Sequence, residues 1–267
     1  MATMPATCET LLVTTLAPHV TLVTMNRPEA SNAVNTRMGQ EMLAFFEEIS
    51  LDPGDVRCIV LTGTGEKAFC AGGDLKERRG MTDEAWQRQH VVFERKARAL
   101  MACPVPVIAA VNGAAFGGGC EMALQCDFIY AATTARFALT EVTLGIMPGA
   151  GGTQNLPRAV GTRRALEVIL TGAPFTADQG LEWGMINRVL PPAELMPAAL
   201  ATAARIAANA PISTRQAKQA VHRGIGLSIW DGLAMEIEAY NRMVPTSDRR
   251  EGVAAYNEKR KPVFTGR

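Results

Sequence analysis

The 267-residue sequence lacks both a broad excess of charge and a long hydrophobic run. Its 27 basic and 26 acidic side chains leave a formal net charge of +1, which gives no electrostatic reason to expect nucleic acid or an anionic membrane as the main partner. No apolar run approaches the roughly 18 residues that a membrane-spanning helix needs. Residues 1–25 contain no Arg or Lys, which argues against a secretory signal or a mitochondrial presequence. We therefore expect a soluble, cytoplasmic protein.

Histidine is scarce, and paired cysteines are absent. There are three histidines, and none of the six cysteines belongs to a Cys-x-x-Cys pair. Most of the cysteines stand in apolar surroundings, which is typical of buried thiols in a reducing compartment and unlike a disulfide framework or a zinc site. Cys70 and Cys120 lie beside glycine turns, but no histidine has an evident relation to them. We interpret both as packing residues rather than nucleophiles, and we expect no metal site.

The chain is long enough for one large domain or for a domain with an appendage, and 48% apolar residues can fill a sizeable core. Strand-like runs alternate with helix-like segments as far as residue 190, whereas only helical segments follow residue 194. This change near residue 195 is the one plausible domain boundary. We predict an α/β core in residues 1–194 and a helical region in residues 195–267.

Residues 112–127 are the stretch around which the rest of the chain is easiest to place. A short apolar run at 106–111 is typical of a buried strand, and three consecutive glycines, 117–119, stand where a helix begins. The first N–H groups of a helix have no internal partner and lie at the positive end of its dipole, so they favour an oxyanion or a carboxylate. Glu121 lies in the first turn, beside that position. Taken alone, the pattern also fits an ordinary strand-to-helix turn.

A second glycine corner lies at residues 71–76, Ala-Gly-Gly-Asp-Leu-Lys. Glycines at such a corner leave backbone N–H groups uncovered, so a ligand can approach them closely. Residues 63–68 match the Gly-x-Gly-x-x-Ala dinucleotide fingerprint, but the glycine corner that follows interrupts the helix that this fingerprint needs. We interpret residues 63–68 as a loop.

Glu141 stands between an apolar segment and a glycine-rich loop at residues 144–154. Partial burial of its carboxyl group would raise the pKa towards neutrality, which suits a group that donates or accepts a proton. On its own, Glu141 would be interpreted as an exposed loop acid.

A long helix is predicted at residues 83–101. Acids are interleaved with its basic residues, which are Arg88, Arg95, Lys96 and Arg98. We interpret these basic residues as a solvated face, with a weak contact to phosphate or RNA as the alternative.

With both glycine corners and both glutamates in view, the sequence resembles the crotonase, or enoyl-CoA hydratase/isomerase, superfamily from about residue 26 to residue 261. The strongest matches are, in chain order, Ala71-Gly72-Gly73-Asp74, Gly117-Gly118-Gly119-Cys120-Glu121, Glu141 and Pro148-Gly149-Ala150-Gly151-Gly152-Thr153-Gln154. The resemblance implies an α/β fold, a spiral of β-β-α units followed by a helical C-terminal region that builds trimers, usually paired into hexamers. Segments at 76–81 and 245–252 also resemble the methylglutaconyl-CoA hydratase branch.

The resemblance also implies roles for single residues. The backbone N–H groups of Gly73 and Gly118 would form an oxyanion hole for the carbonyl of a coenzyme A thioester. The residues expected to contact coenzyme A are Ala71, Asp74, Leu75, Tyr256 and Lys259. Those expected to line the acyl pocket are Phe116 and Leu144. No separate cofactor is expected, because coenzyme A enters as part of the substrate.

The two glutamates favour one reaction within this superfamily. Adding water across a double bond conjugated to a thioester puts negative charge on the thioester oxygen, and losing one N–H donor to such an oxyanion typically costs about 3 to 4 kcal/mol. We expect Glu121 to hold and deprotonate the water, and protonated Glu141 to supply the proton to Cα. The sequence therefore predicts an enoyl-CoA hydratase, a lyase of fatty acid metabolism that acts on a short or branched acyl-CoA. The alternatives are an enoyl-CoA isomerase that uses Glu141 as its single base and, from another class, an RNA-binding protein.

Overall fold

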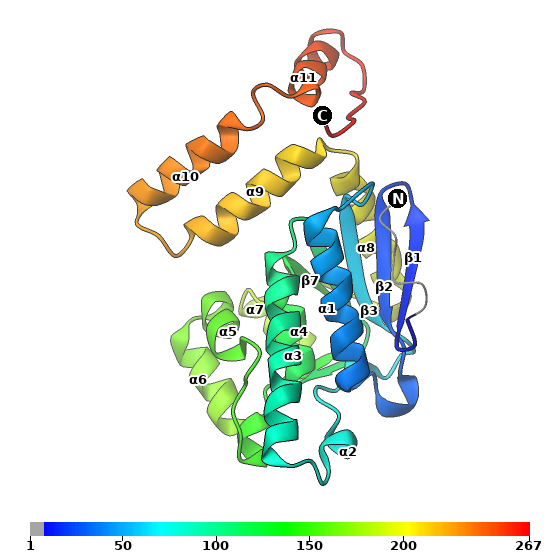
Figure 1. Ribbon diagram of the computed structural model, residues 1–267, viewed down its shortest axis with the longest axis vertical. Coiled ribbons are helices and arrows are strands. Elements are labelled where there is room, and N and C mark those ends of the chain that lie inside the picture. Colours follow the sequence, from blue (N-terminus) through cyan, green and yellow to red (C-terminus); the bar gives the residue numbers. More distant parts are fainter. Residues whose placement is uncertain (1–7) are drawn as a thin grey trace.

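Two β-sheets form the centre of the computed structural model, which describes residues 8–267 (Figure 1). The larger sheet contains, in spatial order, β1 (Leu11–Ala17), β2 (Val20–Met25), β3 (Cys58–Gly63), β5 (Val107–Val111), β7 (Phe128–Ala132) and β10 (Arg188–Leu190). The smaller sheet contains β4 (Ala68–Cys70), β6 (Ala114–Phe116), β8 (Arg136–Ala138) and β9 (Phe175–Thr176). The β1–β2 pair of the larger sheet and the β8–β9 pair of the smaller sheet are antiparallel. All other neighbouring strands in the two sheets are parallel.

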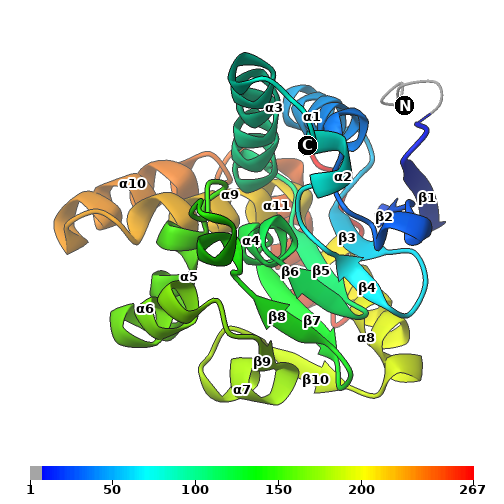
Figure 2. The same ribbon diagram turned by 90° about the horizontal axis from the view of Figure 1, so that it is seen from below.

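The central strands repeat one unit three times. In each unit, a strand of the larger sheet is followed by a strand of the smaller sheet and then by one or two helices. In the first unit, β3 and β4 lead to α2 (Leu75–Arg78) and α3 (Asp83–Ala102). In the second, β5 and β6 lead to α4 (Gly118–Gln125), and in the third, β7 and β8 lead to the 3-10 helix η2 (Glu141–Leu144) and α5 (Gly152–Val160). Each unit adds one strand to each sheet, so the chain advances as a spiral. This confirms the predicted α/β fold of β-β-α units, and Figure 2 shows α4 close to the strands of the smaller sheet.

Local sequence explains these elements. Every residue of β3 and of β5 is buried, as expected for parallel strands that are covered on both faces. Helix α1 (Thr36–Leu51) begins where the Asn35 side chain accepts a hydrogen bond from Met38 N, which satisfies one of the unpaired N–H groups at the helix start. Its apolar face, which includes Phe45 and Phe46, is buried in the core beside α3.

Four further elements lie outside the repeated units: the 3-10 helix η1 (Pro28–Ala30), α6 (Thr162–Thr171), α7 (Ala177–Glu182) and α8 (Pro192–Ala207). Helix α8 packs across strands of the larger sheet through small buried side chains at four-residue spacing, Ala199, Ala203 and Ala207. The boundary expected at residue 195 therefore falls inside a helix that belongs to the core.

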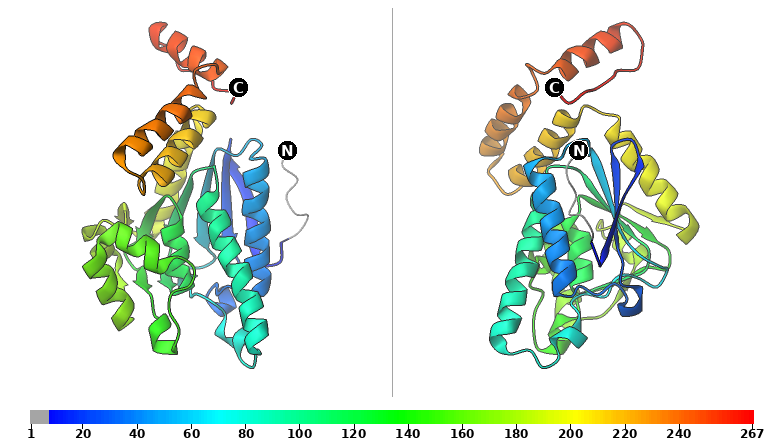
Figure 3. Two further views of the ribbon diagram at one scale, coloured as in Figure 1. Left: turned by 60° about the vertical axis from the view of Figure 1, so that its left-hand side comes forward. Right: turned by 45° about the vertical axis from the view of Figure 1, so that its right-hand side comes forward.

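The last three helices leave the core. They are α9 (Pro211–Gly224), α10 (Ile229–Asn241) and α11 (Ser247–Asn257), and they extend away from the sheets (Figure 3). α9 and α10 pack against each other as a hairpin. Within residues 8–267, no helix combines the length and the apolar character needed to cross a membrane.

Candidate active site

The two glycine corners meet at one point. Gly72 has a φ of +96°, and a Cβ built on it would lie 3.3 Å from Gly118 N, while a Cβ built on Gly118 would lie 3.8 Å from Gly73 N. Val34 bonds to the residues on either side of Gly73, through Gly72 O and Asp74 N. Among the described residues, neither Gly73 N nor Gly118 N has a hydrogen-bond acceptor. Two free N–H donors side by side, one of them at the start of α4, are suited to bind a developing oxyanion.

Glu121 lies in the first turn of α4 and is held by the glycine-rich loop after η2. Its Oε1 accepts hydrogen bonds from Ala150 N and Gly152 N, each at 2.8 Å. Gln125 supports this loop by donating from Nε2 to Ala150 O at 2.6 Å. The side chain is buried, yet it borders a cavity. Because Oε1 is engaged, Oε2 is the oxygen left to hold a water molecule.

Glu141 opens η2 and approaches the same point from the other side. A Cβ built on Gly117, which has a φ of +51°, would lie 3.2 Å from Glu141 Oε1. Its Oε2 is buried and has no hydrogen-bond partner among the described residues. Burial, with a smaller contribution from the charge of Glu121, raises the pKa of Glu141 to about 7. A carboxyl group with this pKa can be protonated near neutral pH and can donate its proton.

A cavity of about 730 Å³ joins these groups. Of the residues predicted from the sequence, it is lined by Gly73, Gly118, Glu121, Glu141, Ala71, Leu75 and Leu144. Phe116 is not among the lining residues, because it lies on β6 behind the glycines of the corner, with its carbonyl oxygen 2.9 Å from the Cβ position of Gly72. The structure thus brings together the predicted catalytic groups but leaves Phe116 outside the pocket.

Asp74 has an internal role. Its carboxylate accepts from Lys76 N and Glu77 N at the start of α2 and forms a 2.8 Å ion pair with Arg27. Asp74 does not line the cavity. These internal contacts of Asp74 fix the glycine corner. The contact of Asp74 with coenzyme A stays a prediction, and the internal contacts do not support it.

Tyr256 and Lys259 are far from the cavity of their own chain. They lie at the end of α11, whereas α2 is at the opposite end of the long axis of the molecule (Figure 1). Tyr256 is 84% exposed. Contact of these two residues with coenzyme A stays a prediction, and the cavity of their own chain does not include them.

Sequence reasoning missed one wall of the cavity. Trp86, His90, Phe93 and Lys96 follow one another along α3 and line the cavity, together with Arg78 of α2. Lys96 was expected on a solvated face, but it is only 3% exposed, because this side of α3 packs towards α4. The spacing of Trp86, His90 and Phe93 at i, i+4 and i+7 was the signal that could have revealed this face.

The cysteines beside the glycine corners are inert. Cys70 and Cys120 are fully buried, and burial raises the pKa of both thiols. The reactive thiolate form is disfavoured, so the packing role expected for them is confirmed.

The fold and the site define a class of enzyme in which two free backbone N–H groups and two carboxyl groups face one cavity. Comparison with known proteins indicates the same class of enzyme. Residues 16–267 match the family model described as "Enoyl-CoA hydratase/isomerase". YngF of Bacillus subtilis is 46% identical over 258 residues, which cover 97% of this chain and 99% of that protein. The short-chain-enoyl-CoA hydratase of Clostridium acetobutylicum is 43% identical over 242 residues, 91% of this chain and 92% of that protein.

A solved structure shows the same fold. The enoyl-CoA hydratase from Bacillus anthracis superposes with a TM-score of 0.95 at 42% identity, over 97% of this chain and 100% of that chain. The chain therefore belongs to the enoyl-CoA hydratase/isomerase family of the crotonase superfamily. It is an enzyme of the enoyl-CoA hydratase class.

Proposed function

We propose that the protein catalyses the reversible syn addition of water across the 2,3-double bond of a short or branched enoyl-CoA. The observation that carries this proposal is the placement of two chemically different carboxyl groups on one cavity beside two free N–H donors. Glu121 has one oxygen fixed by two N–H groups, whereas the pKa of Glu141 is raised to about 7 by burial. Two carboxyl groups in such different environments are suited to separate base and acid roles.

In the proposed reaction, the thioester oxygen accepts hydrogen bonds from Gly73 N and Gly118 N. Glu121 binds water through Oε2 and takes its proton as the oxygen attacks Cβ. Negative charge then develops on the thioester oxygen, where the two donors stabilise it. Glu141 donates its proton to Cα on the same face, and the roles reverse for dehydration. Coenzyme A takes part only as a portion of the substrate, and no separate cofactor belongs to this proposal.

We also propose that the chain assembles as a homotrimer, or as a hexamer of two trimers. The support is the run of exposed large apolar side chains on the α9–α10 hairpin. Such a patch marks an interaction surface on a protein that would otherwise expose it to water. Assembly would also bring Tyr256 and Lys259 of one copy within reach of coenzyme A bound to another. Because the proposed substrate is an enoyl-CoA, we also propose that the protein acts in fatty acid metabolism, in the cytoplasm.

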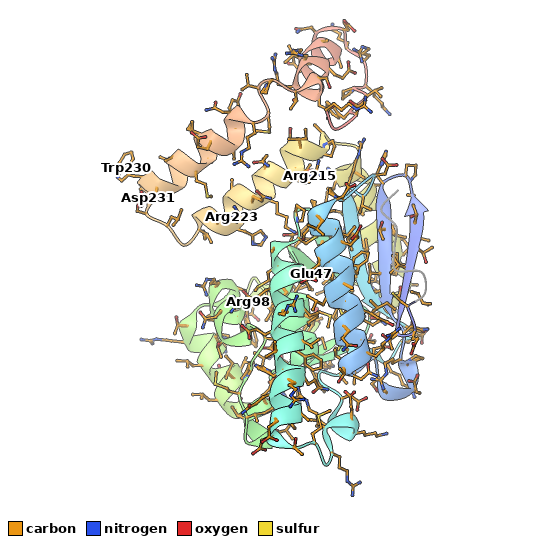
Figure 4. The ribbon with its side chains drawn as sticks, viewed as in Figure 1. Glu47, Arg98, Arg215, Arg223, Trp230 and Asp231 are labelled. Carbon is orange, nitrogen blue, oxygen red and sulfur yellow. The ribbon has the colours of Figure 1, made fainter. Side chains whose placement is uncertain are left out.

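The alternative reactions have less support. An isomerase that uses Glu141 as its single base has no need of a second buried carboxylate that is positioned by two N–H groups. For RNA binding, a coherent basic stripe is required, but Arg95 of α3 pairs with Glu47 of α1, and Arg98 pairs with Glu94 within α3. Figure 4 shows where Glu47 and Arg98 lie on these two helices.

Hydration is tested by the loss of enoyl-thioester absorbance with crotonyl-CoA. Wild type should turn over, whereas Glu121→Gln and Glu141→Gln should each lower kcat by at least about 100-fold, since acid–base groups typically contribute 10²- to 10⁴-fold. The control is Glu94→Gln, an exposed acid on α3, which should keep full activity. Near-normal turnover by Glu121→Gln would contradict hydration by the pair.

The pH dependence gives a second test. Because Glu141 must be protonated to donate, kcat/KM for hydration should fall as the pH rises through about 7. A hydration rate that stays level up to pH 9 would rule out Glu141 as the acid.

A further inference from the structure

Lys96 is a buried cation for which the proposed reaction has no direct use. It lies on the buried face of α3, one turn after Phe93 and one turn before Leu100, and it is 3% exposed. Among the described residues, its Nζ has neither a hydrogen-bond acceptor nor an ion-pair partner. The side chain lines the active-site cavity, and its nitrogen is not fully enclosed by protein atoms, so the amine faces the cavity. A lysine held in this way is costly unless an anion compensates it.

The groups that act on Lys96 include one anion. Burial lowers the pKa of the lysine amine, and Cys70, Glu121 and Cys126 oppose this effect. Burial raises the pKa of both thiols, so Cys70 and Cys126 are neutral near pH 7. Glu121 is the acid that remains. It belongs to α4, which packs against α3 beside the cavity that both side chains line. The charged forms of Lys96 and Glu121 therefore stabilise each other.

The other charged groups near this part of α3 do not compensate Lys96. On α1, which packs along α3, Glu41 forms an ion pair with Arg37, and Glu47 forms one with Arg95. The further titratable side chains that line the cavity are Arg78, His90 and Glu141. Arginine and histidine side chains carry no negative charge, so the choice of partner for Lys96 lies between the two glutamates.

The charge of Lys96 acts on one of these glutamates. Burial is the main cause of the raised pKa of Glu141, and the charge of Glu121 contributes to it, whereas Lys96 is not among the groups that act on Glu141. Two carboxylates beside one cavity disfavour each other's ionisation, so one of them ionises more readily than the other. A cation on the side of Glu121 decides which one.

We propose that Lys96 is a positioning residue of the proposed reaction, a countercharge that keeps Glu121 ionised as the base while Glu141 stays protonated as the acid. Lys96 acts through Glu121 and takes no proton in the reaction. The N–H groups of Ala150 and Gly152 fix one oxygen of Glu121, and the ammonium group of Lys96 adds a full positive charge to these two dipoles. This inference rests on the proposed function, because it explains how the two carboxyl groups of that site keep different protonation states.

The pH dependence of kcat/KM with crotonyl-CoA tests this role. The acid limb of the profile reports the ionised base, and the alkaline limb reports the protonated acid. Lys96→Met removes the charge and keeps a side chain of similar length. We expect the variant to move the acid limb up by at least about 1 pH unit and the alkaline limb by less than about 0.3 unit, because the charge acts on Glu121 rather than on Glu141.

Two further variants show whether the charge is the cause. Lys96→Arg keeps the cation, so both limbs should stay within about 0.3 unit of wild type, even where the larger side chain lowers the rate. The matched control is Lys67→Met, which removes the same charge from an exposed residue that does not line the cavity, and its profile should coincide with that of wild type. A loss of rate in Lys96→Met with both limbs in place, or an equal shift of both limbs, would overturn the inference.

Thermal unfolding separates this inference from the proposed function, because it needs no turnover. At pH 6, where Glu141 is mostly protonated, the Tm is measured for wild type, Lys96→Met, Glu121→Gln and the double variant. Lys96→Met should lower the Tm by at least about 3 °C more in wild type than in Glu121→Gln, because only the wild-type chain has a buried carboxylate that loses its countercharge. Additive changes in Tm would overturn the inference. Coupled changes in a chain that does not hydrate crotonyl-CoA would support the charge pair and count against the proposed function alone.

Discussion

At the scale of a single residue, the raised pKa of Glu141 lowers the free energy of unfolding at neutral and alkaline pH. Its pKa rises from 4.5 to about 7 on folding, mainly through burial. Between these values the folded protein binds more protons than the unfolded chain, so the free energy of unfolding falls as the pH rises, and the whole cost is present above about pH 7. Stability at pH 8 therefore includes the penalty for an ionised carboxylate whose Oε2 has no partner among the described residues.

Glu141→Gln should remove that penalty. We expect the variant to be more stable than wild type by about 1 to 2 kcal/mol at pH 8, a value reduced for solvent that enters the open cavity, and to show almost no gain at pH 4.5. Thermal unfolding followed by circular dichroism at both pH values measures the difference. A gain of the same size at pH 4.5 would mean that the charge is not the cause.

At the scale of an element, one partly buried acid fastens α9 to the core. Asp127, just before β7, accepts from Val107 N at 2.6 Å and pairs with Lys218 at 2.8 Å and His222 at 2.7 Å, both on α9. Burial alone would raise the pKa of Asp127, but the contacts with His222 and Lys218 hold it below its ordinary value. The stability from this group is thus complete above pH 3.8 and is lost as the pH falls through the lower folded-state pKa.

Asp127→Asn should loosen α9 from the sheet. We expect a loss of about 2 to 4 kcal/mol, because Lys218 is left buried with its charge uncompensated, and faster amide exchange in residues 211–224. Hydrogen exchange read by mass spectrometry measures the second effect. The control, Glu94→Gln, breaks an exposed pair with Arg98 and should cost less than about 1 kcal/mol. Unchanged exchange in α9 would show that apolar packing alone holds this helix.

The elements also show where sequence reasoning succeeds. The two glycine corners and the two glutamates were predictable because their function lies in backbone N–H groups and first-turn acids, which are encoded over a few consecutive residues. Lys96 was not predictable in this way, because interleaved charges on α3 look like a solvated face until the partner of that face is known. The domain boundary near residue 195 stays a prediction. The sequence of α8 predicts only one more helix, and its packing on the sheet became evident from the structure.

At the scale of the whole molecule, α10 carries an apolar stripe that the single chain leaves exposed. The stripe consists of Trp230, Leu233, Ile237 and Tyr240, at i, i+3, i+7 and i+10 on one helical face. Trp230 lies at the free end of the α9–α10 hairpin (Figure 4). Helices that extend from a core and expose such a face gain stability by packing against other copies of the chain, which is the basis of the proposed trimer.

Ile237→Asp tests the stripe at its centre. Wild type should sediment at three or six times the chain mass of 28.6 kDa, and the variant should shift towards a single chain, because a carboxylate buried in an apolar interface is uncompensated. Leu51→Asp places the same change on an 83% exposed leucine at the end of α1 and should keep the wild-type mass. If Tyr256 and Lys259 contact coenzyme A across the interface, the dissociated variant should also bind coenzyme A more weakly in a calorimetric titration. Full dissociation with unchanged affinity would instead mean that each chain binds coenzyme A alone.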